Sequence, residues 1–383
     1  MQENETPRVL FVSKPMSPPF RDGSKCLVRD LCLNLREFQP HIMSTKAGAD
    51  VLNHKAKLHA VYGDSGQFSP GLGQNLRAFS WLLRSPRVEI WHSIFAPNPR
   101  ASLALRALAR VRRRLVCQTI ASPPREFTHP ERLLFGDIVV VQSAWTKTRF
   151  LDAYAAGAAL PPQIVEIPPP CPELAIPEPS RVESTRFELG LEAHDPLFVY
   201  PGDIEVSSAA AFLMNWAKHL RAHIPRGKLV VAYRNKSAGT RAAVELLKDQ
   251  VDPGSVLFRE NVNDIVSLLS AAEAVLFPVD DLYGKVDLPI VLLEAMKVGT
   301  PVFALDSGPL QSLKGATLLE DSQETWLKAA SDLVHNPRLK EQLVEQGQQA
   351  ITNIYNAQVV ARAYEEVYRE LLSGRFSTKN NSK

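Results

Sequence analysis

The chain has 383 residues, of which 45% are hydrophobic and 22% are charged. This length and composition are typical of two or three globular domains and exclude a disordered regulator. The formal net charge of +3 comes from 44 basic and 41 acidic residues. That balance excludes nucleic acid as the main partner.

Cysteine usage and the apolar stretches bear on the compartment. The four cysteines form no CxxC pair and no zinc-type spacing with histidine, as in reduced proteins. The longest apolar stretches fall short of the roughly 20 residues that a membrane span requires, and the start of the chain lacks a secretion signal. We therefore expect a cytoplasmic protein, with peripheral attachment to the inner face of the membrane as its only membrane contact.

Short β-branched segments alternate with helical patterns in the first part of the chain. Leu27, Leu31 and Leu35, for example, recur on one face of a predicted helix. Such alternation indicates a parallel sheet covered by helices on both faces. The predicted strands are 9–13, 89–91, 115–119 and 137–142, and the predicted helices are 24–35, 101–111 and 145–156.

Proline interrupts this pattern near the middle of the chain. Eight prolines lie between Pro161 and Pro179, where they stiffen the backbone and remove hydrogen-bond donors. We interpret residues 171–190 as a proline-rich linker between two domains. After it the alternation resumes, with predicted strands at 197–200, 229–233, 256–258, 274–277 and 302–305 and helices at 326–334 and 339–353.

The pattern as a whole predicts an α/β fold with two tandem, doubly wound, Rossmann-like domains. The first covers residues 1–170, the second covers 191–355, and residues 356–383 form a final helix with a polar tail. Ligands of such folds bind at the carboxyl ends of the strands. We therefore expect the active site in a cleft between the two domains.

The segment most informative about function runs from Lys285 to Val302. Pro289 suits the first turn of a helix, because its missing N–H has no partner there. The free N–H groups of Leu288 and Ile290, together with the helix dipole, would bind a phosphate or diphosphate. Glu294 lies one turn further in and would accept hydrogen bonds from ribose hydroxyls. The alternative is a buried strand–helix unit in which Glu294 is satisfied by the protein.

The residues of this segment resemble a known signature. Leu288-Pro-Ile-Val-Leu-Leu-Glu-Ala-Met, followed by Gly299-Thr-Pro-Val, resembles the donor site of retaining GT-B glycosyltransferases. The similar family is the large one of glycosyltransferase family 4 type, which includes sucrose synthase and bacterial mannosyltransferases. Further likeness extends over residues 139–143, 199–202, 256–262 and 268–278.

The resemblance implies a function as well as a fold. It implies transfer of a sugar from a nucleotide-sugar donor with retention of the anomeric configuration. No metal or other cofactor takes part, and the acceptor is a polysaccharide, a lipid-linked glycan or a small molecule. The leaving diphosphate is neutralised by backbone N–H groups and basic side chains. In the family the last helix crosses back onto the first domain.

The chain departs from the family motif at its first glutamate. Val286 takes that place, and we expect the neighbouring Asp287 to supply part of its catalytic role. In addition, no basic residue follows Gly202 in the loop that normally carries an arginine and a lysine. Arg234 and Lys236, after the next strand, are the predicted replacements on the diphosphate, unless both are solvated surface cations.

Two features of the first domain are candidate site residues. Gly23 would let the backbone approach the donor, and Ser24 would cap the helix that follows, unless this segment is a plain strand–helix turn. His92 follows a predicted strand at its cleft-facing end and is a candidate catalytic residue, although a lone histidine is more often structural. The imidazole that the family often carries after residues 115–119 is absent.

A basic run, residues 106–114, bears on partners. Its arginines are interleaved with apolar residues such as Leu108, with Leu115 following, and residues 76–84 are amphipathic as well. Many relatives in the similar family dock on anionic membranes through such helices. A solvated arginine face is the alternative.

The departures from the motif leave the activity open. A catalytically impaired, nucleotide-sugar-binding protein is the main alternative to an active transferase. A non-hydrolysing nucleotide-sugar epimerase would share the architecture, but it needs cleft carboxylates and a histidine that the sequence does not place.

Overall fold

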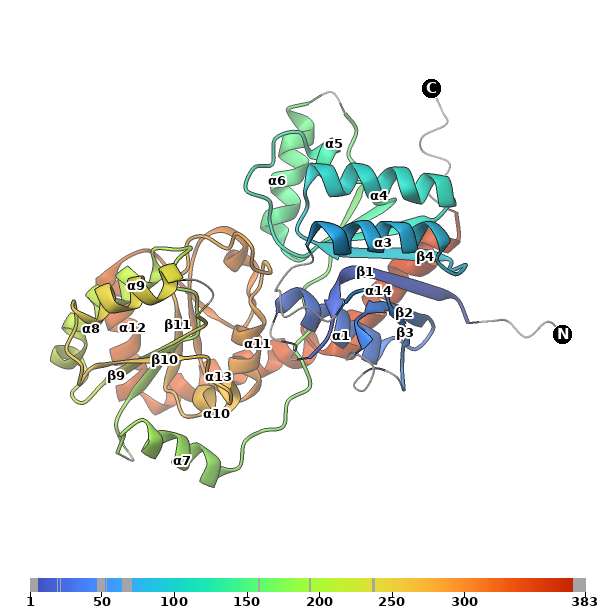
Figure 1. Ribbon diagram of the computed structural model, residues 1–383. Helices are drawn as coiled ribbons and strands as arrows, with labels where there is room; N and C mark the ends of the chain where they lie inside the picture. The colour runs from blue at the N-terminus through green and yellow to red at the C-terminus, as the bar shows by residue number, and fades with distance from the viewer. Residues whose placement is uncertain are drawn as a thin grey trace. The chain divides into compact units, whose positions relative to one another are not determined.

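The computed structural model describes residues 6–18, 20, 22–46, 52, 54–63, 71–157, 159–192, 194–235 and 238–374. They form two compact units, each built on one parallel sheet (Figure 1). The first unit combines residues 1–172 with 283–287 and 356–383. The second unit combines residues 173–282 with 288–355.

The first unit contains a seven-stranded sheet in the order β3-β2-β1-β4-β5-β6-β7. Every neighbouring pair is parallel, as the alternating pattern predicts. Its strands are β1 (Arg8–Met16), β2 (Gln39–Ser44), β3 (Lys57–Ala60), β4 (Ile90–Phe95), β5 (Leu115–Ile120), β6 (Ile138–Val141) and β7 (Gln163–Glu166). Its helices are α1 (Gly23–Asn34), α3 (Leu72–Arg84), α4 (Pro99–Arg112), α5 (Pro130–Leu133), α6 (Ala144–Ala155) and α14 (Ala357–Leu372).

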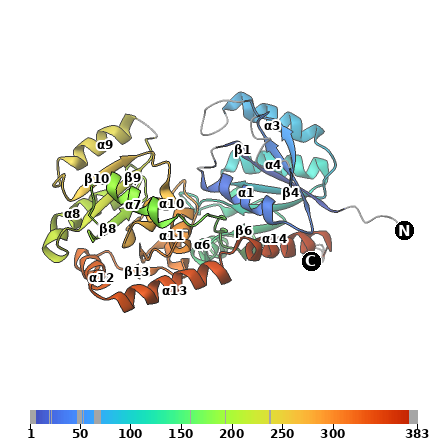
Figure 2. The same ribbon diagram turned by 90° about the horizontal axis from the view of Figure 1, so that it is seen from below.

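Alternate residues of the central strand β1 enter two different cores. Val9 and Phe11 pack in a cluster with α1 and α14, whereas Leu10 and Val12 pack with α3 and α4. Because successive side chains of a strand point to opposite faces, helices cover both faces of this sheet. Figure 2 shows α3 and α14 on opposite sides of the first unit.

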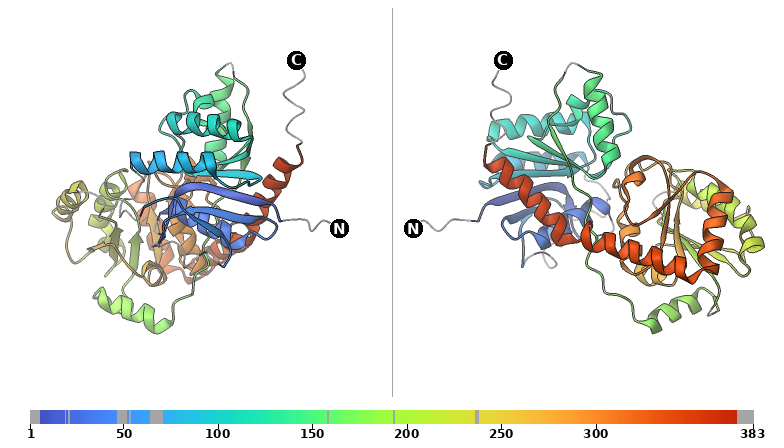
Figure 3. Two further views of the ribbon diagram at one scale, coloured as in Figure 1. Left: turned by 45° about the vertical axis from the view of Figure 1, so that its right-hand side comes forward. Right: turned by 180° about the vertical axis from the view of Figure 1, so that it is seen from behind.

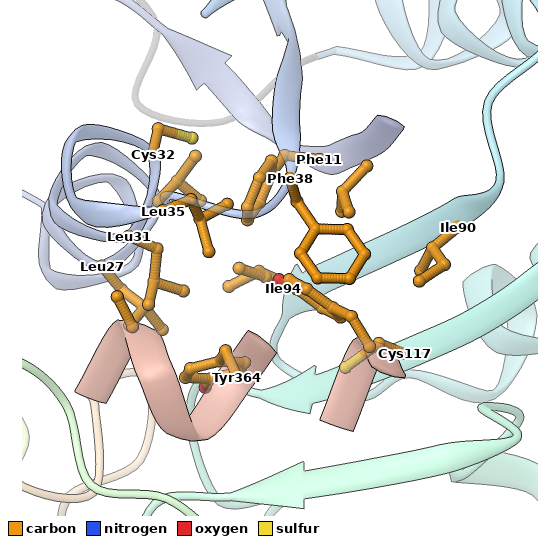
Figure 4. Close-up of a cluster of buried hydrophobic side chains, with 14 of the residues drawn as sticks. Phe11, Leu27, Leu31, Cys32, Leu35, Phe38, Ile90, Ile94, Cys117 and Tyr364 are labelled. Atoms are coloured by element: carbon orange, nitrogen blue, oxygen red, sulfur yellow. The ribbon is translucent and has the colours of Figure 1, made fainter. Parts of the chain in front are cut away.

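Helix α14, the last of the chain, belongs to the first unit and lies across its sheet (Figure 3). Tyr364 and Tyr368 are fully buried in the cluster drawn in Figure 4. The carboxylate of Glu365 is buried too, and it accepts the backbone amides of Arg36 and Glu37 at 2.6 and 2.7 Å. A buried carboxylate with two backbone donors fixes the helix in one register.

The second unit contains a six-stranded parallel sheet in the order β10-β9-β8-β11-β12-β13. Its strands are β8 (Leu197–Tyr200), β9 (Lys228–Tyr233), β10 (Val256–Glu260), β11 (Ala274–Phe277), β12 (Val302–Leu305) and β13 (Thr317–Leu319). The helices are α7 (Pro179–Glu188), α8 (Ala209–His223), α9 (Ala238–Lys248), α10 (Ile265–Ser270), α11 (Ile290–Lys297), α12 (Gln323–His335) and α13 (Pro337–Asn353), with a short 3₁₀ turn η2 (Gly308–Ser312). Strands β8, β11 and β12 are buried throughout, as expected for a parallel sheet covered on both faces.

The proline-rich segment differs from the predicted linker at 171–190. From residue 173 the chain belongs to the second unit, and α7 packs there against α10. Arg181 pairs with Asp264 at 2.8 Å, and Arg186 donates to the carbonyl of Ala271 at 2.9 Å. The prolines flank regular structure instead of replacing it, since Pro179 occupies the first turn of α7.

Two further features concern the cysteines and the lengths of the helices. All four cysteines are described and buried, and none of them forms a disulfide. Within the described residues, the helices are too short or too polar to cross a membrane.

Candidate functional site

Helix α11 begins without a side-chain cap. Its N-cap residue is Pro289, with φ of −59°, and the first turn contains no acidic residue. The first-turn N–H groups of a helix have no intrahelical acceptor, and the dipole adds a partial positive charge there. Gly299, with φ of +81°, lies just after the last turn, as the sequence predicts for a helix stop. The start of α11 therefore has the properties of an anion site.

The side chains around this start lie in the second unit's core. Leu288 and Ile290 are buried, and Glu294 is partly buried one turn further along. A ligand at this helix start would thus meet backbone amides before side chains. The ribose-binding role predicted for Glu294 stays a prediction.

In the loop after β8, close packing requires glycine at position 202. A Cβ atom at Gly202 would lie 2.2 Å from the ring of Tyr200. The Tyr200 hydroxyl donates to the carbonyl of Asp203 at 2.8 Å, so the ring is fixed under this turn. Only glycine fits there, whether or not a ligand approaches.

Arg234 lies beside this loop, as predicted for a residue that leaves the adjacent strand. Its guanidinium is 3.8 Å from the carboxylate of Asp203, and its side chain is 40% exposed. The structure therefore brings Arg234 and the Gly202 turn together at the carboxyl edge of the second sheet. Lys236, the other predicted cation, lies outside the described residues.

Asp280 occupies the start of helix α8 at the same edge. Its carboxylate accepts the backbone amide of Ser208 at 3.0 Å and the Ser208 hydroxyl at 2.8 Å. This contact could not be predicted from the sequence, because the acid comes from the loop after β11, 72 residues away along the chain.

In the first unit, the predicted cap of α1 is wrong. The N-cap is Asp22, whose carboxylate accepts the amides of Ser24 and Lys25 at 3.0 and 3.3 Å. Ser24 lies inside the first turn, because the helix begins at Gly23. Burial raises the pKa of Asp22, but the charge of Lys14, 2.9 Å away, and the hydrogen bonds outweigh it and lower that pKa.

Residues 283–287, which directly precede Leu288, group with the first unit. Val286 is buried and lies next to Gly23, where an added Cβ atom would be 3.0 Å from a Val286 methyl group. The Arg125 guanidinium stacks 4.3 Å from the centre of the Tyr283 ring. Where the family motif has its first glutamate, this chain therefore uses an apolar packing residue.

Asp287 is fully buried and points at the start of helix α6. Its Oδ2 accepts the hydroxyl of Ser143, the N-cap of that helix, at 2.6 Å. Burial raises the pKa of Asp287 to about 6, and the Ser143 hydrogen bond offsets only part of that shift. Within the described residues Oδ1 has no hydrogen-bond partner. This placement does not support the predicted catalytic role, and we assign Asp287 a structural role.

His92 also lies in a core. Strand β4 continues to Phe95, so His92 is inside the strand and not after it. Its ring nitrogens lie 2.7 Å from the Thr119 hydroxyl and 2.6 Å from that of Tyr368. Burial lowers the pKa of His92 to about 3, so the ring is neutral at physiological pH. The predicted catalytic role of His92 is therefore replaced by a structural one.

Comparison with known sequences identifies one match. Residues 195–336 match the family profile described as glycosyl transferases group 1. No curated protein matches the chain in sequence. The matched region contains the edge of the second sheet and the whole of α11.

Solved structures resemble the chain over nearly its whole length. Anabaena HepE in complex with UDP superposes with a TM-score of 0.72 at 16% identity, over 95% of this chain and 100% of HepE. HepE is also known in complex with UDP-glucose. A glycosyltransferase from Rickettsia africae gives 0.71 at 15% identity, over 99% and 100% of the two chains.

One of the similar structures is not named as a glycosyltransferase. The N-terminal domain of Candida albicans trehalose-6-phosphate phosphatase gives a TM-score of 0.70 at 12% identity, over 96% of this chain and 97% of that one. At these identities the likeness concerns the fold alone. The chain has the GT-B fold, with two Rossmann-like α/β units built on parallel sheets.

Proposed function

We propose that this protein is a glycosyltransferase that uses a nucleotide-sugar donor. The observation that carries the proposal is the uncapped first turn of α11, within a region that matches glycosyl transferases group 1. A diphosphate is the kind of ligand that such a helix start stabilises. UDP and UDP-glucose are bound by HepE, which has a similar fold.

In this proposal the second unit provides the donor contacts. The amides of Leu288 and Ile290 would hold the diphosphate, and Glu294 would accept hydrogen bonds from the ribose. Arg234, whose side chain is 40% exposed at the same sheet edge, would add positive charge as the diphosphate leaves. Charge stabilisation of this kind is often the largest contribution to catalysis.

We further propose retention of configuration and no need for a metal or other cofactor, as in the enzymes that the α11 motif resembles. Attack by the acceptor on the face from which the diphosphate departs needs no protein nucleophile. The acceptor class, whether polysaccharide, lipid-linked glycan or small molecule, would be defined by loops of the first unit.

The proposal is tested first by ligand binding and then by turnover. Nucleoside diphosphates are screened by thermal shift on the wild type and on Glu294→Ala. A ligand present at 100 times its Kd should stabilise the wild type by about 2.7 kcal/mol, and Glu294→Ala should weaken that effect. Equal shifts in both proteins would remove Glu294 from the ribose site. No shift with any nucleotide would remove the proposal.

A second candidate function is donor binding without transfer. The buried Val286 in place of the first glutamate favours it, because this residue has no charge to offer a donor. Single-turnover release of nucleoside diphosphate from a bound donor separates the two. Affinity without release would identify a binding protein.

A finer proposal concerns location. Helices α3 and α4 expose Leu72, Leu76, Leu103 and Val111, and arginines are interspersed in both helices. We propose that this face, including residues 106–114, attaches the cytoplasmic protein peripherally to an anionic membrane. Equal co-sedimentation with neutral and anionic vesicles would remove this part of the proposal.

A further inference from the structure

A cavity of about 170 Å³ lies at the C-terminal end of helix α4, where strands β5 and β6 begin. Arg106, Arg110, Arg113 and Arg114 line it, together with Asp137. The volume is well above the ~30 Å³ that one water occupies in the liquid. The arginine pocket, as we call it, therefore has room for a ligand group.

The arginines of this pocket outnumber the carboxylates that act on them. In the part of the chain that the structure describes, none of the four arginines forms an ion pair within 4 Å. Asp137 directs Oδ2 to the backbone amide of Val116 at 2.8 Å. Four arginines therefore line the cavity with one carboxylate, which already has a backbone partner, and the charge of Glu89 also acts on Arg114.

The surroundings of Arg106 and Arg114 show how the arginine pocket is built. Arg106 donates from Nη2 to the carbonyls of Glu131 and Leu134, both at 2.6 Å, which fixes its position and leaves its charge unneutralised. The Nε atom of Arg114 is buried and lacks a hydrogen-bond partner within the described residues. Burial lowers the pKa of Arg114, and the charges of Arg112 and Arg87 lower it further, whereas the carboxylate of Glu89 acts in the opposite direction.

Arg113 stands where glycine is usual. It ends α4 with φ of 50°, and the amides of Arg113 and Arg114 return to the carbonyls of Arg110 and Ala109 at 3.1 and 3.0 Å. In this type of helix end the left-handed position favours glycine, and a side chain there costs free energy. Such backbone is a starting point for assigning a role to the side chain, and here the residue also lines the cavity.

We propose that the arginine pocket binds a phosphate-bearing group, as a phosphomonoester or a diphosphate. Several guanidinium forks in one cavity match the oxygen geometry of phosphate, and clefts of one charge sign concentrate counter-ions. The C-terminus of α4 carries only about half a negative charge, which the arginines outweigh. The site lies at the amino edge of the first sheet and is independent of the proposed donor site on α11.

Binding of inorganic pyrophosphate by isothermal titration calorimetry tests the site in the full chain. Arg113→Gly removes a guanidinium and relieves the left-handed strain, so this variant should fold at least as well as the wild type. We expect it to weaken the pocket's pyrophosphate binding about tenfold, and Arg110→Gln by a similar factor. Arg100→Gln removes the same charge from the exposed start of α4, away from the pocket, and should leave the affinity within about twofold.

Pro289→Asp separates this site from the donor site. A binding component that survives Pro289→Asp and is lost in Arg113→Gly belongs to the arginine pocket. Unchanged pyrophosphate binding in Arg113→Gly and Arg110→Gln would overturn the proposal, whatever happens at α11. Equal weakening by Arg100→Gln would overturn it too, because the effect would then come from general charge.

Vesicle binding identifies the source of the phosphate. Vesicles with phosphatidic acid, whose headgroup is a phosphomonoester, are compared with vesicles of equal charge containing phosphatidylserine. Loss of only the phosphatidic acid preference in Arg113→Gly indicates a lipid headgroup. Pyrophosphate binding without any such preference indicates a soluble phosphate compound.

Discussion

The first turns of helices α1 and α11 differ in what faces their backbone amides. In α1 the Asp22 carboxylate accepts two of those amides, whereas Pro289 gives α11 no side-chain cap. Both helices follow a strand of a parallel sheet, so both starts carry the same partial positive charge. The protein therefore satisfies one of these starts with its own carboxylate and leaves the other, where we propose that a diphosphate binds, without a side-chain cap.

Helices α6 and α8 extend the comparison. Asp287 hydrogen bonds to Ser143 at the start of α6, and Asp280 to Ser208 at the start of α8. Both acids come from the loop between β11 and α11, and neither caps α11 itself. The proposed diphosphate site is thus the start of a helix from which these two nearby carboxylates are directed away. Four changes test this reasoning, in order of decreasing effect.

Neutralising Asp287 should have the largest effect, on stability. Its pKa is raised from 3.8 to about 6, so the folded state holds its proton more tightly than the unfolded state. Stability is therefore lost as the pH rises from about 4 to 6, by about 3 kcal/mol in all. Asp287→Asn should be more stable than the wild type by that amount at pH 8 and equal to it below pH 4, in urea unfolding. Asp280→Asn is the control, and a difference independent of pH would contradict this account.

Giving α11 a cap like that of α1 should abolish its anion site. In Pro289→Asp the new carboxylate would take the first-turn amides and repel a diphosphate. We expect a loss of nucleoside diphosphate affinity of about 2 kcal/mol, or thirtyfold, and a gain in stability of about 1 kcal/mol. Pro289→Ala is the control in calorimetric titration, since it removes the ring without adding charge. Equal affinities in both variants would show that the ligand binds elsewhere.

Removing the cap of α1 should cost about 1 kcal/mol of unfolding free energy. Asp22→Ala loses the hydrogen bonds to two backbone amides and the ion pair with Lys14. Asp22→Asn keeps an oxygen acceptor for the amides and should lose less than half as much. Chemical denaturation measures both variants, and equal losses would mean that the charge, and not the cap, stabilises the turn.

The smallest effect is expected at the contact between Gly23, which begins α1, and Val286, which precedes α11. In Gly23→Ala the added methyl group would press on Val286, at a cost of about 1 kcal/mol. Val286→Ala should relieve that pressure in the double variant, so the two changes should be non-additive by at least about 0.5 kcal/mol. Additive losses in a double-mutant cycle would show that Gly23 is required for another reason.

Much of the fold could be predicted from the sequence, because buried parallel strands are apolar throughout. The predicted strand 197–200 coincides with β8, and 274–277 with β11. Strand β2 was missed because its residues Gln39, Pro40 and His41 have no apolar pattern, although the strand pairs with β1. Strand β7 lies among prolines, and the sequence therefore predicts an interruption of the α/β pattern there instead of a strand.

The candidate site could be predicted only where its signal is local. Pro289 and Gly299 delimit α11 through backbone preferences, which sequence records directly. The contact between Asp280 and Ser208 could not be predicted, because it depends on which strands are neighbours in the sheet. His92 was misplaced by a strand that extends four residues further than predicted, which moves the imidazole into the core beneath α14.

The path of the chain has a consequence for biosynthesis. The first unit's core includes Val360, Tyr364 and Leu371 of α14, residues that leave the ribosome after the whole second unit. The unit that begins the protein is thus finished last, and the part of its Phe11 face that α14 covers stays exposed until the end of synthesis. A nascent or truncated chain that ends before residue 357 would present that apolar face to chaperones and proteases, which would allow the cell to discard incomplete copies.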